Sequence, residues 1–144
     1  MEDIILKCIN IKKTLVEADE FDKGQRMLLN FGHTLGHAIE KYYNFDGISH
    51  GRAVAIGMCL MSQASENLNI TKVGTTEKLK ACLEKYGLET HTDVKNADLM
   101  ESCLNDKKRD SDKINIIVCI DIGESEIINI SIPECYKFLG VENV

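Results

Sequence analysis

Three histidines close together in the sequence are the side chains best suited to chemistry. His33 and His37 lie four positions apart, which places both imidazoles on one face of a helix, about one turn from each other. His50 follows the next predicted loop, and an antiparallel pairing of the two helices would bring it back towards His33. Converging imidazoles suit a divalent cation such as zinc. Histidines that only form hydrogen bonds in a core would show the same spacing.

Glycines accompany these histidines at Gly32, Gly36, Gly51 and Gly57. A glycine inside a helix costs about 1 kcal/mol relative to alanine. Several of them in predicted buried helices therefore indicate close approach of another backbone or of a ligand. Tight packing between helices would explain them equally well.

A second group of candidate residues is cationic and consists of Lys12, Arg26, Lys107 and Lys108. Arginine offers a planar fork to phosphate or carboxylate, and lysine offers a point charge. These residues could converge on an anion, or they could be ordinary solvated charges. The net charge of −6 argues against nucleic acid or an anionic membrane as the main partner. A small anionic substrate remains compatible, because a few local cations can dominate one pocket.

Hydrophobic periodicity predicts the elements that must position these residues. It predicts helices over 4–17, 27–45, 51–67, about 75–87 and 96–106, a hairpin over 114–132 and a short last helix over 133–140. The second and third helices are apolar nearly all round, which is typical of buried helices. The predicted fold is a single, mostly α domain over 1–144 with one small β-hairpin near residues 114–131.

The cysteines and the N-terminus indicate the cellular compartment of the protein. The six cysteines have neither CxxC nor zinc-ribbon spacing, so we expect reduced, buried, structural thiols. The N-terminus has acidic residues at positions 2 and 3 and no cleavable apolar region. This pattern predicts a cytoplasmic protein without a signal peptide. No apolar run in the sequence is long enough to span a bilayer.

A series of short sequence blocks follows one another along the chain. The blocks are K-x(3)-V-x(2)-D-E at Lys12–Glu20, G-x-R at Gly24–Arg26, L-N-F-G-H-T-x-G-H-A-I-E at Leu29–Glu40, H-G-x-A-V-A-I-G-M at His50–Met58 and D-K-K at Asp106–Lys108. This order and spacing resembles that of the dehydroquinate synthases, within the sugar-phosphate cyclases. The resemblance covers nearly the whole chain.

The resemblance implies an enzyme of two domains, in which a Rossmann-like N-terminal half binds NAD and a helical C-terminal half carries most metal- and substrate-binding groups. It implies that this chain is the C-terminal domain, without the NAD-binding domain. The implied reaction is that of a phosphate-eliminating lyase in the shikimate pathway, which converts a seven-carbon sugar acid phosphate to 3-dehydroquinate. The isolated chain would then be inactive, and the full-length protein would form a homodimer.

The resemblance also implies roles for individual residues. His33 and His50 would be ligands of zinc or cobalt, and His37 would lie near the leaving phosphate and the path of proton transfer. The residues implied to act on the substrate are His37, Lys12, Arg26 and Asn30, together with one of Lys107 and Lys108.

Two departures from the family pattern leave alternatives open. The third metal ligand of the family is a glutamate whose sequence context is absent here. Arg52 follows the HG of the second histidine block, where the family usually has glutamate. A cation pointing towards the metal would weaken metal binding, and one pointing outward would not. A non-catalytic binding module, or a cyclase of the deoxy-scyllo-inosose or valiolone type, therefore remains an alternative.

Overall fold

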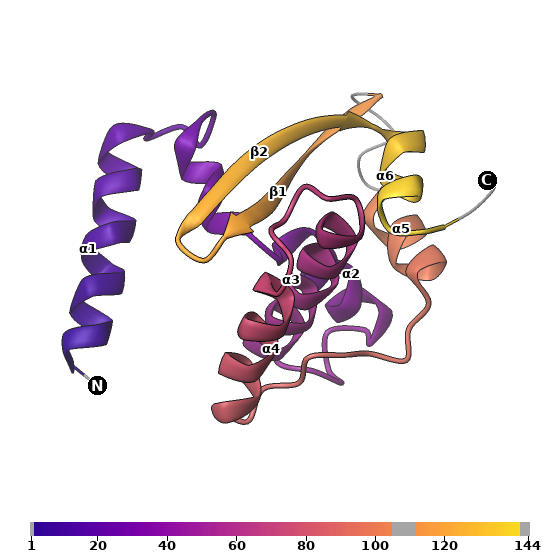
Figure 1. Ribbon diagram of the computed structural model, residues 1–144, viewed down its shortest axis with the longest axis horizontal. Helices are drawn as coiled ribbons and strands as arrows, with labels where there is room; N and C mark the ends of the chain where they lie inside the picture. Colours follow the sequence, from indigo (N-terminus) through magenta and orange to yellow (C-terminus); the bar gives the residue numbers. More distant parts are fainter. Residues whose placement is uncertain (1, 105–111, 142–144) are drawn as a thin grey trace.

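A computed structural model describes residues 2–104 and 112–141 of the chain (Figure 1). The elements are α1 (Glu2–Ala18), a 3-10 helix η1 (Gln25–Asn30), α2 (His33–Tyr42), α3 (His50–Asn67), α4 (Thr75–Lys85), α5 (Asn96–Leu104), β1 (Lys113–Asp121), β2 (Glu124–Ser131) and α6 (Ile132–Phe138). This confirms a mostly α fold with one small hairpin. Lys107 and Lys108 lie outside the described residues.

The continuous helix predicted over 27–45 is wrong at both ends. Its first part is η1, and the backbone then turns at Gly32, whose φ is 79°. Its last part ends at Tyr42, followed by Asn44 and Phe45 with φ of 53° and 60°. The left-handed region favours glycine, so Gly32 permits the turn that separates η1 from α2. The apolar run conceals this break because the residues on both sides of it remain hydrophobic.

The close approach that the glycines predict is found between α2 and α3. A Cβ at Gly32 would lie 2.8 Å from the carbonyl oxygen of Val54, and one at Gly57 would lie 2.8 Å from the backbone nitrogen of Gly36. Real Cβ atoms do not approach backbone so closely, so these glycines set the separation of the two helices. Gly51 differs, because a Cβ there would meet no atom of the described residues within 4 Å.

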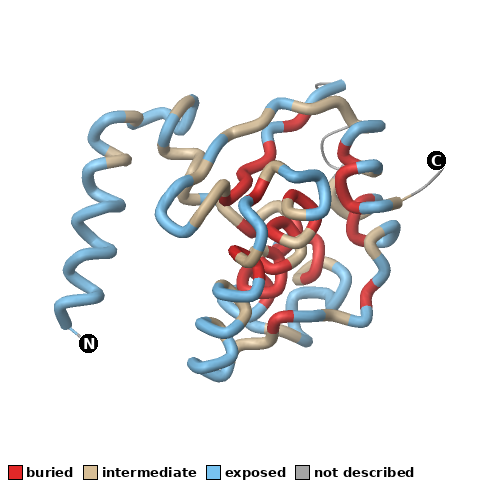
Figure 2. The backbone as a smooth tube through the Cα atoms, viewed as in Figure 1, coloured by how far each residue is buried: buried red, intermediate tan, exposed pale blue. Residues whose placement is uncertain are grey.

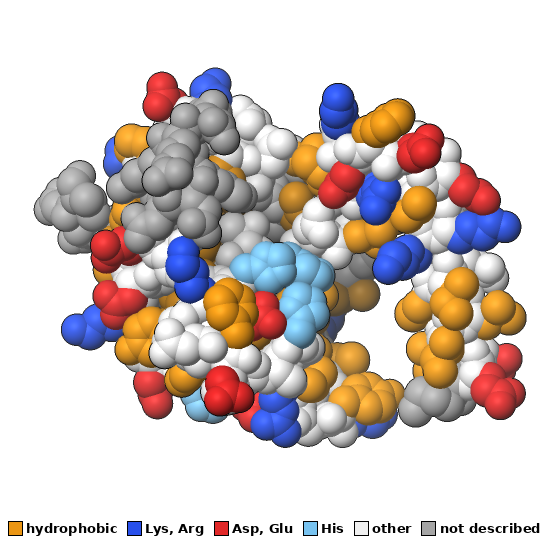
Figure 3. All heavy atoms as spheres, turned by 180° about the vertical axis from the view of Figure 1, so that it is seen from behind, with side chains coloured by type: hydrophobic (Ala, Val, Ile, Leu, Met, Phe, Trp, Pro, Cys, Tyr) orange, Lys and Arg blue, Asp and Glu red, His pale blue; other side chains and the backbone are white. Residues whose placement is uncertain are grey.

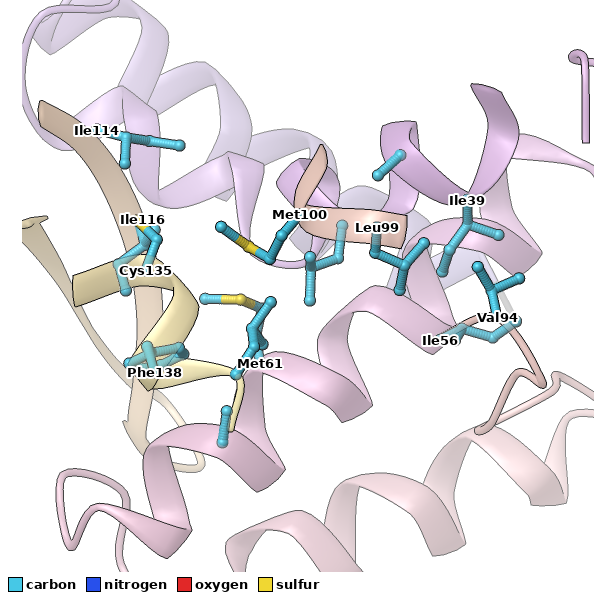
Figure 4. Close-up of a cluster of buried hydrophobic side chains, with 14 of the residues drawn as sticks. Ile39, Ile56, Met61, Val94, Leu99, Met100, Ile114, Ile116, Cys135 and Phe138 are labelled. Atoms are coloured by element: carbon cyan, nitrogen blue, oxygen red, sulfur yellow. The ribbon is translucent and has the colours of Figure 1, made fainter. Parts of the chain in front are cut away.

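The core lies where α2, α3, α5, α6 and the hairpin meet (Figure 2). Figure 4 shows its side chains converging from these elements, among them Ile39, Ile56, Met61, Leu99, Met100, Ile114, Ile116, Cys135 and Phe138. Burial of these apolar surfaces is the main force that holds the helices and the hairpin together.

The predicted hairpin forms, with its turn at Gly123, whose φ is 91°. Strands β1 and β2 pair antiparallel with Ile114 opposite Ile130, and β1 is the more buried of the two. The last helix begins at Ile132, with Ser131 and Glu134 forming a capping box. Asn96 is the first residue of α5, and its side-chain amide donates to the carbonyl oxygen of Leu139 at 2.8 Å.

The six cysteines differ in burial, and Cys103 is intermediate. Cys59, Cys119 and Cys135 are buried as predicted, and burial raises the pKa of Cys59 from 9.0 to about 11. The prediction is wrong for Cys8 and Cys82, which are exposed. Cys8 is exposed because α1 packs against η1 and has no buried residue along Glu2–Ala18 (Figure 1). Within the described parts of the chain, no helix is both long and apolar enough to cross a membrane.

Candidate metal and anion site

The three histidines singled out in the sequence form one cluster. The ring centroids of His33 and His37 lie 5.6 Å apart, those of His33 and His50 lie 5.2 Å apart, and those of His37 and His50 lie 5.7 Å apart. Figure 3 shows a compact patch of histidine side chains near the centre of one face of the molecule. The predicted convergence of the imidazoles is therefore confirmed.

The close packing of α2 and α3 explains why the rings meet. His33 is the first residue of α2, directly after the turn at Gly32, and His37 follows one turn later. His50 is the first residue of α3, after Ser49 in an extended conformation. Because glycines allow the two helices to approach closely, the start of α3 lies against the histidine face of α2.

Two of the imidazoles are oriented by acceptor oxygens. Nδ1 of His33 lies 3.3 Å from the carbonyl oxygen of Phe31. Nδ1 of His50 lies 3.2 Å from both carboxylate oxygens of Glu40. The side chain of Glu40 is only 13% exposed, whereas that of His50 is 55% exposed.

Glu40 has no role among the predictions made from the sequence, although a signal for it exists. Positions 33, 37 and 40 are spaced i, i+4 and i+7 and therefore share one face of α2. The pattern H-x(3)-H-x(2)-E is thus sufficient to place the carboxylate beside the two histidines. Its contact with His50, by contrast, depends on how α3 packs.

The donor atoms of this cluster fit a divalent transition metal. Ligand atoms of His37, Glu40 and His50 all lie within 4.8 Å of one another. The set differs from the pair His33 and His50 implied by the resemblance, with His50 common to both. Imidazole nitrogens with a carboxylate are the donors of many zinc sites, and cobalt accepts the same ligands.

A cavity of about 440 Å³ lies beside two of the histidines. Its lining includes Asn30, His33, His37, Lys41 and Phe45. The structure thus brings Asn30 of η1, a predicted substrate-binding residue, next to two of the candidate histidines. A lysine and an amide beside imidazoles could contact an anionic or hydroxyl-bearing ligand.

The predicted cationic residues do not come together in the same way as the histidines. Among the described residues, neither Lys12 nor Arg26 lines this cavity. Lys12 lies on the exposed helix α1. The guanidinium of Arg26 donates to the carbonyl oxygen of Glu20 at 2.8 Å, and its backbone N–H donates to Asp19. Backbone hydrogen bonds, the largest from Lys23, lower the pKa of the Asp19 carboxyl.

Arg52 makes its ion pair outside the histidine cluster. Its Nη1 lies 2.8 Å from Oε1 of Glu89. Both residues line a different cavity of about 630 Å³, together with Tyr43 and His91. The pairing with Glu89 favours the outward orientation, in which the guanidinium does not oppose a metal ion at the histidines.

Comparison with known proteins identifies a family that matches this sequence. The family model described as 3-dehydroquinate synthase C-terminal matches residues 1–109. The chain is 51% identical to a 3-dehydroquinate synthase of Clostridium kluyveri over 100% of this chain and 40% of the relative. It is 45% identical to that of Clostridium acetobutylicum over 98% of this chain and 40% of the relative. The chain thus spans well under half the length of these curated relatives.

Solved structures share the fold at lower sequence identity. One is 2-deoxy-scyllo-inosose synthase complexed with carbaglucose-6-phosphate, NAD+ and Co2+, with a TM-score of 0.76 and 21% identity, covering 99% of this chain and 41% of that one. Another is 2-epi-5-epi-valiolone synthase from Streptomyces hygroscopicus with NAD+ and Zn2+ bound, with a TM-score of 0.69 and 21% identity, covering 90% of this chain and 37% of that one.

Proposed function

This chain belongs to the 3-dehydroquinate synthase family, and on that premise we propose that it is the metal- and substrate-binding part of a 3-dehydroquinate synthase. The enzyme would be a lyase that converts a seven-carbon sugar acid phosphate to 3-dehydroquinate with release of phosphate, in the shikimate pathway. The observation that carries the proposal is the convergence of three imidazoles beside a cavity that Asn30 also lines.

His33 and His50 are the proposed ligands of zinc or cobalt. Support comes from the 5.2 Å between the ring centroids of His33 and His50, because imidazole is a common zinc ligand. The two related structures bind Co2+ and Zn2+. A metal held there would polarise hydroxyl and carbonyl oxygens of the substrate. We assign to His37, which is exposed and lines the cavity, a role in proton transfer near the leaving phosphate.

The substrate is an anion with carboxylate and phosphate groups, so an acidic chain needs a locally cationic pocket to bind it. We assign the binding of the substrate's phosphate and hydroxyl groups to Lys12, Arg26 and Asn30, with one of Lys107 and Lys108. Support comes from the position of Asn30 in the cavity lining and of Arg26 on the same element, η1. Helix α1, which carries Lys12, contacts η1.

An NAD-binding domain would lie outside this chain. The relatives are much longer than the region matched here, and NAD+ is bound in both related structures. We therefore propose that the isolated chain is inactive, and that the full-length protein acts in the cytoplasm as a homodimer. The missing domain and a sugar phosphate would be the partners of this chain.

Phosphate release tests the proposal. The chain is assayed alone and mixed with the unmatched N-terminal part of the Clostridium kluyveri relative, with NAD+, Zn2+ and the seven-carbon sugar acid phosphate. We expect release only from the mixture.

His33→Ala should lower the rate by more than about 100-fold, since even changes to residues that only support the metal ligands cost 10–100-fold. His91→Ala, at an exposed histidine of the other cavity, should not. A mixture with His33→Ala that works at the parent rate would refute the metal assignment.

Two alternatives give different outcomes in the same assay. Another sugar-phosphate cyclase would leave the seven-carbon acid unchanged and turn over a different sugar phosphate, which product analysis would identify. The relatives at 45–51% identity are named 3-dehydroquinate synthases, which favours the first function. A non-catalytic module would show no turnover in any mixture.

A further inference from the structure

We propose that Glu40 is the positioning residue of the histidine cluster, holding His50 as the Nδ1–H tautomer with Nε2 directed to the metal. This inference rests on the proposed function only for the identity of the bound group. The contact itself is between two side chains of this structure, one on α2 and one at the start of α3.

The chemistry of the contact determines the tautomer. Both carboxylate oxygens of Glu40 lie 3.2 Å from Nδ1 of His50. An ionised carboxylate can only accept hydrogen bonds, so Nδ1 must carry the hydrogen. In a neutral imidazole the lone pair then resides on Nε2, which is the nitrogen left to bind a metal.

His33 has the same arrangement with a different acceptor. Its Nδ1 lies 3.3 Å from the carbonyl oxygen of Phe31, which likewise can only accept. Both proposed ligands are therefore held with Nδ1–H towards the protein. For His33 the backbone supplies the acceptor, and for His50 the side chain of Glu40 supplies it, so only the second can be removed by substitution.

His50 depends on this contact more than a buried histidine would. It is the first residue of its helix and its side chain is 55% exposed, whereas that of Glu40 is 13% exposed. Packing therefore holds the carboxylate in place, and the carboxylate holds the ring. Carboxylates behind a ligating histidine also raise the basicity of the imidazole, and their loss typically lowers metal affinity 10–100-fold.

A direct bond from Glu40 to the metal is the competing arrangement. Oxygens of Glu40 lie within 4.8 Å of ligand atoms of His37 and His50. Such a bond would compete with the hydrogen bond to His50, because the carboxylate would have to turn from Nδ1 to the metal. The nearly equal approach of both oxygens to Nδ1 favours the positioning role.

The test uses the full 144-residue chain and three variants, Glu40→Ala, Glu40→Gln and the control Glu101→Gln at an exposed position of α5. The tautomer of His50 is read without metal from long-range proton–nitrogen correlation NMR spectra. Zn2+ affinity is read by competition with a chromophoric chelator. The visible spectrum of bound Co2+ reports the ligand set. Circular dichroism verifies that each variant is folded.

We expect Glu40→Ala to abolish the preference for Nδ1–H and to weaken Zn2+ binding by about 10–100-fold, with the Co2+ spectrum at saturation unchanged in shape. Glu40→Gln should retain the tautomer and much of the affinity, since its amide oxygen still accepts the hydrogen bond. The control should match the parent chain. Retention of the tautomer in Glu40→Gln, together with its loss in Glu40→Ala, would therefore identify Glu40 as a positioning residue.

Two results would overturn the inference. One is a His50 tautomer and a Zn2+ affinity that are the same in Glu40→Ala as in the parent. The other is a Co2+ spectrum altered by both Glu40 variants, which would make Glu40 a ligand. If the parent chain binds neither metal, the tautomer measurement alone decides. Loss of the Nδ1–H preference in Glu40→Ala would support the positioning role, and an unchanged tautomer would overturn it.

Discussion

At the scale of single residues, the geometry of the site depends on glycines as well as on histidines. Gly32, Gly36 and Gly57 allow close contact between the backbones of α2 and α3, because a Cβ at any of these positions would lie too close to backbone atoms of the other segment. His33 and His50 are the first residues of these same two helices, and His37 lies one turn further along α2. A larger residue at the crossing would separate the helices, and with them the imidazole rings, because packed interiors transmit a local misfit.

Substitution of Gly57 by alanine tests this dependence. The added Cβ would clash with backbone atoms of Gly32 and Gly36, which cannot rotate away. We expect a loss of about 1–3 kcal/mol in the free energy of unfolding, as for other overpacked cores, and weaker Zn2+ binding. Urea denaturation and metal titration are the measurements.

Gly51→Ala is the matched control, because its Cβ would meet no described atom within 4 Å. It should leave the chain unchanged or up to about 1 kcal/mol more stable, since alanine favours a helix. Equal stability of the two variants would show that the crossing is not tightly packed.

At the scale of elements, a buried hydroxyl network joins the end of α3 to the hairpin. Oγ1 of Thr71 donates to the carbonyl oxygen of Cys119 in β1 at 2.6 Å and lies 2.5 Å from Oγ of Ser65 in α3. All three residues are buried. The network therefore satisfies polar groups that would otherwise be costly to bury.

Thr71→Val removes the hydroxyl and keeps the shape of the side chain. We expect a loss of about 1–3 kcal/mol in the free energy of unfolding, because the carbonyl oxygen of Cys119 loses its side-chain donor in a buried site. Thr14→Val, at an exposed position of α1, is the control and should have little effect. Thermal and urea unfolding of both variants are compared, and a stable Thr71→Val chain would contradict the role of the network.

At the scale of the whole molecule, α1 is separate from the core. It contacts η1, and the space-filling view in Figure 3 shows a gap between the rest of the helix and the body. Five of its apolar residues remain 53–60% exposed, namely Ile4, Ile5, Leu6, Ile9 and Ile11. Monomeric soluble proteins seldom expose contiguous apolar surface of this kind.

We therefore predict that the isolated chain self-associates through α1. Light scattering after size exclusion should give a mass above 16.1 kDa that rises with concentration. Ile4→Lys combined with Ile11→Lys should restore the monomer without lowering the melting temperature, because neither side chain is buried. Val73→Lys, at an isolated exposed residue outside α1, should leave association unchanged. A parent chain that is monomeric at every concentration would contradict the prediction.

Local sequence determined much of this protein. The spacing of apolar residues predicted the hairpin and most of the helices, but not the break at Gly32. The spacing of His33 and His37 placed both rings on one helical face. These features depend on residues within a few positions of one another, so the periodicity of helix and strand is enough to predict them.

The tertiary structure alone decided the contacts between distant residues. The pairing of Glu40 with His50, the pairing of Arg52 with Glu89 and the exposure of Cys8 follow from how whole elements pack. No periodicity encodes such contacts, because they depend on the crossing of α2 with α3 and on what covers α1. The residues that could form the site were thus recognisable in the sequence, whereas the packing of the helices determined which side chains contact each other.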